Sequence, residues 1–321
     1  MRRFCKVFTL ILALMLSWQV STGCAKQPDK KAYYRIVVAS DVHFPSKFFS
    51  KNKPVKGELM VRHKNQAVED INSWQDVDLV AFTGDMIAKS GTEKAYQESA
   101  AFAMQIKKPK VFMTGNHEYF YASSYNTKKK SWRAKPEESK REFQYFHKYF
   151  ETPQLYKAQR LGKYLLIFLS PDNPAARYPT EMSSAELNWL KKTLAENKKC
   201  PTIIFFHGPL KGTLISYTPK VNGPQYIAQP WEKIDAIIAA NPQIKIWASG
   251  HTHTSPRNPS FHNKLNWYRG KVLDVHNPSW EGKQVWTNSL YLYPDRIVVK
   301  TYDHKEHKFI DRFTREIKIV A

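Results

Sequence analysis

The chain has 321 residues, 42% of them hydrophobic, which is ample for a buried core in one large domain or two small ones. Its 50 Lys and Arg residues against 28 Asp and Glu give a formal charge of +22, a balance compatible with binding of nucleic acid, anionic lipid or an acidic wall polymer, or simply with a well-solvated surface. The three cysteines, Cys5, Cys24 and Cys200, have no Cys-x-x-Cys spacing, which excludes a cysteine zinc site. Two of them lie within the first 24 residues, which read as an export signal, and this argues against a disulfide framework.

Residues 1–23 are predicted to be a signal peptide of the lipoprotein type. Basic residues near the start precede a mostly apolar run, residues 7–20, which is shorter than a transmembrane helix requires. The following Ser-Thr-Gly-Cys24 resembles a bacterial lipoprotein processing box, in which the cysteine becomes the lipidated first residue, although Ser21 stands where the box prefers an aliphatic residue. We therefore expect export and lipid anchoring at Cys24, on the extracytoplasmic side of a bacterial membrane. An ordinary cleaved signal and an uncleaved anchor are the alternatives.

Residues 24–32 have the composition of a polar tether, and a single domain is predicted over residues 33–321. Within it, short β-rich runs alternate with stretches of helical spacing, a pattern typical of a layered α/β fold. The predicted strands cover residues 33–40, 78–82, 111–114, 165–170, 202–206 and 244–248. The predicted helices cover residues 62–74, 93–106, 137–150, 184–196 and 231–240.

The pattern changes after Lys271, where strands joined by short turns replace the alternation. Residues 272–276, 289–293 and 296–303, followed by a basic tail, are expected to add antiparallel strands to a second sheet. Residues 122–136 have a loop composition and directly follow a polar turn, so we expect them to form a rim or lid.

Polar side chains capable of binding metal follow five of the predicted strands. In layered α/β proteins, ligands gather at the carboxyl ends of the strands, so the five turns can converge although they span much of the chain. These turns carry Asp41-x-His43, Gly84-Asp85, Gly115-Asn116-His117-Glu118, His207 and Gly250-His251-x-His253.

The residue types suit a metal site. Asp and His donate oxygen and nitrogen to Mn, Fe, Zn and similar ions, and the x-spaced pairs leave their strands facing one side. The glycines permit tight turns, Asp85 is the natural bridging carboxylate, and Asn116 offers a neutral carbonyl oxygen. Two divalent ions, two aspartates and a hydroxide sum to a formal charge of about +1, which attracts a phosphate ester. The two metals also lower the pKa of the bridging water and clamp the attacking and leaving oxygens.

In this order, the five motifs resemble those of the calcineurin-like metallophosphoesterase family, over Asp41 to His253. The resemblance implies an α/β fold: a four-layer β-sandwich flanked by helices, with a dimetal site at the carboxyl-terminal edge of the strands. It also implies two metal sites that share Asp85. The first would use Asp41, His43, Asp85 and His253, and the second Asp85, Asn116, His207 and His251.

Two further site residues follow from the resemblance. His117 corresponds to the catalytic histidine that contacts the phosphate and assists the leaving group. Glu118 stands where many members have Asp, and we expect it to orient His117 or a neighbouring ligand. His276 ends an apolar run and either approaches the site or caps a strand, whereas the remaining histidines are expected to be structural. The aromatic residues over 119–125 either line a substrate rim or pack a loop onto the body.

The predicted function is hydrolysis of phosphomonoesters or phosphodiesters by a hydroxide activated by two metal ions, outside the cytoplasm. The alternative is a lipid-anchored surface protein that binds anionic wall polymer or nucleotide with little or no turnover. Candidate partners beyond the substrate are an anionic cell-wall polymer or a membrane surface, and nucleic acid is not favoured. The sequence leaves open the metal, the oligomeric state and the choice among nucleotide, cyclic nucleotide, phospholipid and wall polymer.

Overall fold

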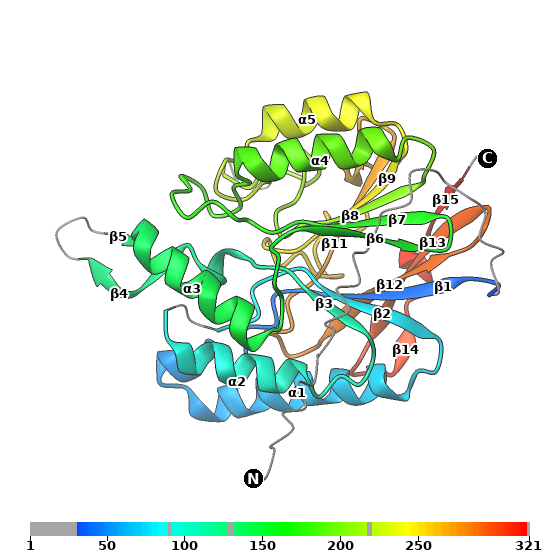
Figure 1. Ribbon diagram of the computed structural model, residues 1–321. Coiled ribbons are helices and arrows are strands. Elements are labelled where there is room, and N and C mark those ends of the chain that lie inside the picture. The colour runs from blue at the N-terminus through cyan, green and yellow to red at the C-terminus, as the bar shows by residue number, and fades with distance from the viewer. Residues whose placement is uncertain (1–30, 89–90, 127–130, 217–219, 320–321) are drawn as a thin grey trace, which may run out of the picture.

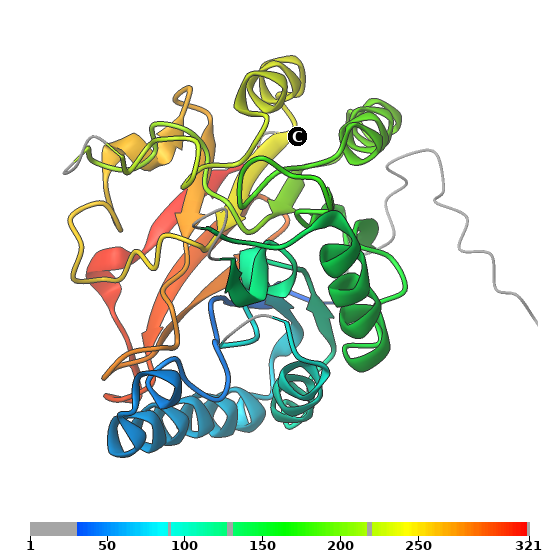
Figure 2. The same cartoon turned by 90° about the vertical axis from the view of Figure 1, so that its left-hand side faces the viewer.

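The computed structural model describes residues 31–88, 91–126, 131–216 and 220–319. Two β-sheets pack face to face, and helices cover the outer face of each (Figure 1). Turned by 90°, the molecule shows α1 and α2 on one side and α4 and α5 on the other, with the strands between them (Figure 2). The predicted four-layer α/β sandwich is thus confirmed. The predicted signal peptide, Cys24 and most of the tether lie outside the described residues and stay predictions.

The first sheet joins the N-terminal and C-terminal parts of the chain in the order β14-β13-β12-β1-β2-β3, with β15 paired to β13. Three parallel strands open it, namely β1 (Tyr34–Ala39), β2 (Val77–Phe82) and β3 (Lys110–Phe112). Antiparallel strands extend it on the other side of β1, namely β12 (Trp286–Leu292), β13 (Arg296–Asp303), β14 (Lys308–Phe309) and β15 (Arg315–Lys318). Helices α1 (Pro54–Ser73) and α2 (Glu93–Ala103) cover its outer face (Figure 1).

The second sheet has the order β10-β11-β9-β8-β7-β6. Its central strands are parallel: β7 (Tyr164–Phe168), β8 (Thr202–Phe205), β9 (Ile244–Ser249) and β11 (Val272–His276). Its edges, β6 (Lys157–Leu161) and β10 (Trp267–Tyr268), are antiparallel to their neighbours. Helices α4 (Ser184–Glu196) and α5 (Trp231–Ala240) cover its outer face (Figure 1).

The prediction for the C-terminal strands is wrong in part. Strands β12, β13 and β15 are antiparallel as expected, but they extend the sheet that β1 opens instead of a second sheet. Strand β11 does lie in the second sheet, where it runs parallel to β9. The alternation of a strand's side chains specifies which face is buried and not which strand is its neighbour, so these partners were open until the chain packed.

The core explains why the strands are apolar on both faces. Between the sheets, side chains such as Val38, Leu166 and Ile246 are buried against one another. On the outer faces, Val37 packs with α1 and α2 residues, and Ile204 packs with α4 and α5 residues. A strand that is covered on both sides reads as a continuous apolar run, which is how these segments appear in the sequence.

Three local elements differ from the sequence prediction. Helix α1 begins at Pro54, where proline suits the first turn, and not near residue 62. The predicted loop over 122–136 contains the paired strands β4 (Tyr121–Asn126) and β5 (Ser131–Arg133), which project from the body ahead of α3 (Pro136–Tyr149) (Figure 1). The connections between these elements also contain short 3₁₀ helices, η1 to η4, at Phe49–Lys51, Asn116–Glu118, Lys264–Asn266 and Asp311–Phe313.

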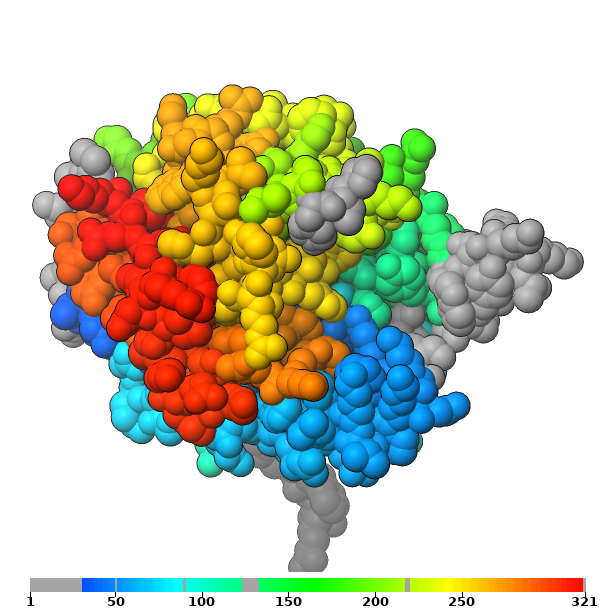
Figure 3. All heavy atoms as spheres, turned by 180° about the vertical axis from the view of Figure 1, so that it is seen from behind, coloured from blue at the N-terminus to red at the C-terminus, as the bar shows by residue number. Residues whose placement is uncertain are grey.

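Seen from behind, the segment around residues 250–270 lies against the C-terminal strands (Figure 3). The rings of Phe261 and Phe313, 5.2 Å apart, make this contact. Cys200, the cysteine within the described residues, is buried and forms no disulfide with another described residue. No helix in the described part of the chain is long and apolar enough to cross a membrane.

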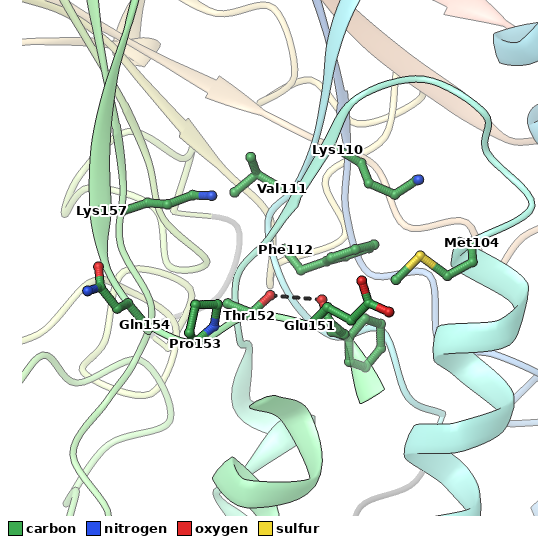
Figure 4. A pocket seen from close by; sticks show the side chains of 10 residues that line it. Met104, Lys110, Val111, Phe112, Glu151, Thr152, Pro153, Gln154 and Lys157 are labelled. Carbon is green, nitrogen blue, oxygen red and sulfur yellow. Dashed lines mark hydrogen bonds between the residues drawn. The ribbon is translucent and has the colours of Figure 1, made fainter. Parts of the chain in front are cut away.

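A cavity of about 310 Å³ opens beside the edge strands β3 and β6. Phe112 and Val111 lie in its wall between Lys110 and Lys157 (Figure 4), and Phe150 also lines it. None of the seven predicted metal ligands lines it, so it is separate from the centre described next.

Candidate metal centre

The structure brings all seven predicted metal ligands to one edge of the sandwich. Each lies in a turn that directly follows β1, β2, β3, β8 or β9. The ligand atoms of Asp41, His43, Asp85 and His253 lie within 4.8 Å of one another, and so do those of Asp85, His207 and His251. The two groups share Asp85, as the sequence predicts.

The first group surrounds a carboxylate that is only half satisfied. Asp41 Oδ2 accepts hydrogen bonds from the Ser40 hydroxyl at 2.6 Å and from the His251 backbone N–H at 3.0 Å. Its other oxygen, Oδ1, is buried and has no hydrogen-bond partner apart from the His253 Nε2 nitrogen, 3.0 Å away. A buried carboxylate oxygen that meets only one imidazole nitrogen is incompletely satisfied, and a bound cation would satisfy both groups.

The second group lies on the other side of Asp85. His207 Nε2 is 3.4 Å from Asp85 Oδ1 and 3.0 Å from Asn116 Oδ1. Asp85 Oδ2 instead faces the first group, 3.7 Å from His43 Nε2. One carboxylate oxygen therefore faces each group, which is the arrangement that a bridging ligand requires.

Backbone carbonyls select the tautomers of three histidines. His43 Nδ1 is 3.2 Å from the Ile87 carbonyl, His207 Nδ1 is 2.8 Å from that of Thr83, and His251 Nε2 is 2.8 Å from that of Gln225. A carbonyl only accepts, so each of these nitrogens carries a hydrogen, and the opposite nitrogen is the one that a metal would use. His207 Nε2 lies 3.0 Å from the Asn116 oxygen, which is an acceptor, so without a metal this nitrogen donates a proton to it, and a shared cation would take the place of that proton.

The charges in the centre also favour cations. Burial alone would raise the pKa of Asp85, but the imidazoles of His207 and His117 hold it well below its usual value. Burial lowers the pKa of His207, and the charge of Asp85 outweighs it and raises that pKa to about 9. Burial holds the pKa of His43 well below its usual value, which keeps this imidazole neutral and its lone pair available. The donor set of carboxylates, imidazoles and an amide therefore fits divalent metals that take mixed oxygen and nitrogen ligands, with His207 releasing its proton when a metal binds.

Backbone strain is concentrated at these same residues. Five of the seven predicted ligands have positive φ angles between 47° and 63°, namely Asp41, His43, Asp85, His251 and His253. Such left-handed conformations are unfavourable for residues with a Cβ and recur at functional sites. Gly250 makes the crowding possible, since a Cβ there would lie 1.9 Å from Ser40 Oγ and 2.4 Å from Asp41 Oδ2.

Glu118 ties the turns together. It is fully buried, and its carboxylate accepts backbone hydrogen bonds from Asp85 at 2.9 Å, Met86 at 2.7 Å, Ile87 at 3.1 Å and Gly115 at 2.6 Å. It therefore fixes the turn of Asp85, the predicted neighbouring ligand, which is one of the two roles that we expected for it.

His117 lies beside the ligands without belonging to either group. Its ring centroid is 4.7 Å from that of His43, and its Nε2 is 3.9 Å from Asp85 Oδ2. Burial lowers the pKa of His117 to about 4. The negative charge of Asp85 opposes this lowering, and the positive charge of Lys47 adds to it. Its Nδ1 atom is buried and has no hydrogen-bond partner. The structure thus puts an unused imidazole group next to the predicted metals, where a phosphate would bind.

Two tyrosines border the centre. Tyr121 packs edge-on against His117 with ring centroids 5.3 Å apart, and the exposed Tyr226 lies 6.3 Å from His251. Of the aromatic residues over 119–125, the buried Tyr119 stacks on Phe143 of α3, which is the packing role that we expected. Tyr121 lies beside His117, and its role at a substrate rim stays a prediction.

The other histidines have partners away from the centre. His276 caps the end of β11, with Nδ1 3.4 Å from Ser249 Oγ and Nε2 3.3 Å from the Thr213 carbonyl. Partners elsewhere in the fold also contact His63, His147, His262, His304 and His307. The Gln225 carbonyl is a contact that sequence reasoning missed, because any residue supplies a carbonyl and no side-chain pattern reveals it.

The comparisons agree with this geometry. The sequence model of the calcineurin-like phosphoesterase family matches residues 34–255. Among solved structures, a dimetal phosphatase from Danio rerio is similar over 90% of this chain and 100% of its own, with a TM-score of 0.58 and 12% identity. A purple acid phosphatase isolated from yellow lupin (Lupinus luteus) seeds is similar over 90% of this chain and 54% of its own, with a TM-score of 0.57 and 14% identity. At these identities the structural likeness shows the fold. None of the curated protein sequences matches the chain.

Proposed function

The chain belongs to the calcineurin-like phosphoesterase family, and from this we propose that it hydrolyses phosphomonoesters or phosphodiesters outside the cytoplasm with water as the nucleophile. Members of this family are metal-dependent phosphoester hydrolases, and the protein therefore uses divalent metal ions as cofactors. The observation that supports the proposed hydrolysis by metal-activated water is the convergence of seven donor side chains from five turns, with Asp85 shared between two groups.

We assign the ligands by position. Asp41, His43 and His253 would hold one ion, Asn116, His207 and His251 the other, and Asp85 both. When bound, two such ions lower the pKa of a water between them and neutralise charge on the phosphate. The protein fixes the donors in advance, through the carbonyls that select the imidazole tautomers and through Glu118, so little reorganisation is needed on binding.

His117 is proposed as the catalytic residue that this chain itself supplies. Its Nε2 nitrogen, 3.9 Å from Asp85 Oδ2, faces the centre and can donate a hydrogen bond to a phosphate oxygen or assist the departing alkoxide. The position fits, because its ring packs on His43 and its backbone N–H donates to Asp85 Oδ1 at 2.8 Å.

The test is hydrolysis of p-nitrophenyl phosphate and bis-p-nitrophenyl phosphate with added Mn²⁺, comparing the purified protein with its Asp85→Asn variant. We expect turnover by the wild type, and loss of both metal content and turnover in the variant. Metal binding without turnover on either ester would favour a binding role for anionic polymer or nucleotide. A protein that binds no metal would contradict the proposal at its root.

The cellular location is a separate proposal. The basic start, the apolar run and the box ending at Cys24 support export and lipid attachment. Cells expressing the protein would be labelled with a fatty-acid analogue, beside the Cys24→Ala variant. Label that is present in the wild type and lost in the variant supports a lipoprotein, whereas label that is equal in both excludes Cys24 as the site.

A further inference from the structure

Residues 48–62 form a basic and apolar surface segment just after the turn that carries His43. The segment includes η1 and the first half of α1, and it has four basic residues and one acidic residue, Glu58. It also exposes large apolar side chains: Val55 is 77% exposed and Phe49 37%, two of the five such residues in the described part of the chain. Apolar groups that stay in water gain free energy when a partner covers them, so this segment is a candidate contact surface.

The lysines of the segment have no counter-charges. Lys51, Lys53 and Lys56 are exposed, and none of them forms an ion pair with a described residue. The ring of Phe48 lies 4.0 Å from Lys56 Nζ and 5.8 Å from Lys51 Nζ, so both ammonium groups are kept near the same aromatic ring. The surface therefore presents unpaired positive charges interleaved with apolar side chains.

The segment has a fixed conformation. The ring of Phe49 packs on Gly57, where an added Cβ would lie 2.8 Å from it. The backbone N–H of Lys53 donates to the Phe48 carbonyl at 3.1 Å, and that of Gly57 donates to the Lys53 carbonyl at 3.0 Å. Because these contacts exist before any partner binds, little conformational entropy is lost when the segment docks.

A buried ion pair joins this segment to the metal centre. Lys64 of α1 is fully buried, and its ammonium group donates to the carbonyls of His43 and Pro45, both at 2.9 Å. It also forms an ion pair with Glu281 at 2.6 Å, and Glu281 accepts a hydrogen bond from the Ser46 hydroxyl. Helix α1 and the segment before β12 lie side by side, as Figure 3 shows and as this ion pair requires. A surface that binds residues 48–62 would thus hold the metal centre at a fixed position relative to itself.

We propose that residues 48–62 dock the protein on a lipid bilayer that contains anionic headgroups. Phe49 and Val55 would enter the headgroup region, and the lysines would pair with lipid phosphates. Each lysine near an anionic bilayer strengthens binding roughly fivefold. Nucleic acid or an anionic wall polymer would use the lysines but would leave Val55 in water, whereas a bilayer accommodates both kinds of side chain. This inference depends neither on the proposed hydrolysis nor on lipid attachment at Cys24.

The first experiment is flotation of the purified full-length protein with phosphatidylcholine vesicles, with and without phosphatidylglycerol, over a range of lipid concentrations. One variant removes the charges, and a second, Val55→Ser, removes an apolar contact without changing the charge. The charge variant combines Lys51→Gln, Lys53→Gln and Lys56→Gln. Its matched control combines Lys191→Gln, Lys198→Gln and Lys199→Gln, three exposed lysines on and just after α4. Leu265→Ser, at a side chain that is 41% exposed in η3, is the control for Val55→Ser.

The second experiment reports contact at the segment itself. An environment-sensitive dye is attached to Val55→Cys in a background with Cys5→Ser and Cys24→Ser, since Cys200 is buried. The same dye on Leu265→Cys is the control. All proteins carry the same residues 1–23 apart from these changes, so the leader contributes equally to each comparison. Metal content and circular dichroism show that every variant keeps the centre and the fold.

We expect the charge variant to bind phosphatidylglycerol vesicles roughly 10- to 100-fold more weakly than the wild type. Val55→Ser should weaken this binding roughly fivefold, and both controls should stay within about twofold of the wild type. The dye at position 55 should report an apolar environment on phosphatidylglycerol vesicles, and the dye at position 265 should not.

Three results would overturn the inference. Equal losses in the two triple-lysine variants would show that overall charge, and not this segment, drives the binding. A loss in the charge variant without any effect of Val55→Ser would indicate a soluble polyanion, such as nucleic acid or wall polymer, in place of a bilayer. A dye at position 55 that stays in water on phosphatidylglycerol vesicles would show that the segment does not reach the lipid.

Discussion

Glu118 and Asp85 are linked in both directions through the main chain. The Glu118 carboxylate accepts from the Asp85 backbone N–H at 2.9 Å, and the Asp85 carboxylate accepts from the N–H of His117, the residue before Glu118, at 2.8 Å. Each turn thus holds the other in place. The position of Asp85 between the two groups of predicted ligands is therefore a property of the pair of turns, and a change in either should move it.

Replacing Glu118 by glutamine should destabilise the protein and weaken metal binding. Each carboxylate oxygen accepts from two backbone N–H groups, so the NH₂ of a glutamine would face donors and leave them unsatisfied. We expect a loss of about 1–3 kcal/mol in the free energy of unfolding, measured in urea with a chelator present. Glu138→Gln is the control, since Glu138 accepts a single backbone N–H at the start of α3. Equal effects of the two substitutions would contradict the special role of Glu118.

Replacing Gly250 by alanine should displace Asp41. The added methyl group would lie 1.9 Å from Ser40 Oγ and 2.4 Å from Asp41 Oδ2, and both atoms belong to the network that fixes this carboxylate. We expect manganese affinity to fall at least about tenfold by titration, because ligand geometry sets affinity. Gly282→Ala should reduce manganese affinity far less, since its nearest contact, the Gln284 carbonyl oxygen, is 3.3 Å away and needs to shift by only a few tenths of an ångström. Full manganese affinity in the Gly250 variant would show that Asp41 is not a ligand.

Replacing His117 by alanine should separate metal binding from catalysis. Its imidazole lies beside the centre but in neither ligand group, so metal content should remain as in the wild type. The turnover number should fall by roughly 10²–10⁴, the usual contribution of a general acid or base. Metal analysis of the dialysed protein and kinetics on both nitrophenyl esters provide the measurements. A variant that loses metal would make His117 a ligand or a structural support instead.

Stability should decline in mild acid through His304. Burial holds the pKa of this histidine below its usual value although Asp70 opposes the shift, so folding favours the neutral imidazole. Because the folded pKa is the lower one, this stabilisation is complete above about pH 6.5 and is lost as the pH falls towards the folded value. His304→Gln should therefore reduce the pH dependence of the unfolding free energy below pH 6.5, by at most about 1.4 kcal/mol per pH unit.

His307→Gln is the matched control for that measurement. His307 contacts the other oxygen of Asp70 at 3.1 Å, but its side chain is 54% exposed. Urea unfolding with chelator present, from pH 7.5 to 5.5, should retain most of the wild-type slope in the His307 variant, because His307 is the smallest of the causes that shift the pKa of His304. An unchanged slope in the His304 variant would show that other buried groups cause the acid sensitivity.

The sequence by itself indicated the layered α/β fold and all seven residues that the structure brings together. It could do so because the ligands are encoded locally. Each predicted ligand lies in the turn that follows an apolar strand, and the carboxyl ends of the strands in a layered sheet meet at one edge. Convergence of Asp41 with His253 therefore needed no knowledge of the intervening loops.

Tertiary structure decided what no local pattern encodes. The partners of the C-terminal strands depended on which edge of β1 remained open, and alternation along a strand does not name its neighbour. Lys64 has the composition of a solvated helix residue, yet it is buried because Glu281, far along the chain, supplies its counter-charge. The Gln225 carbonyl selects the tautomer of His251, and every residue has a carbonyl. Contacts made through the main chain, or between distant charges, depend on position in space, and only the packed chain specifies that position.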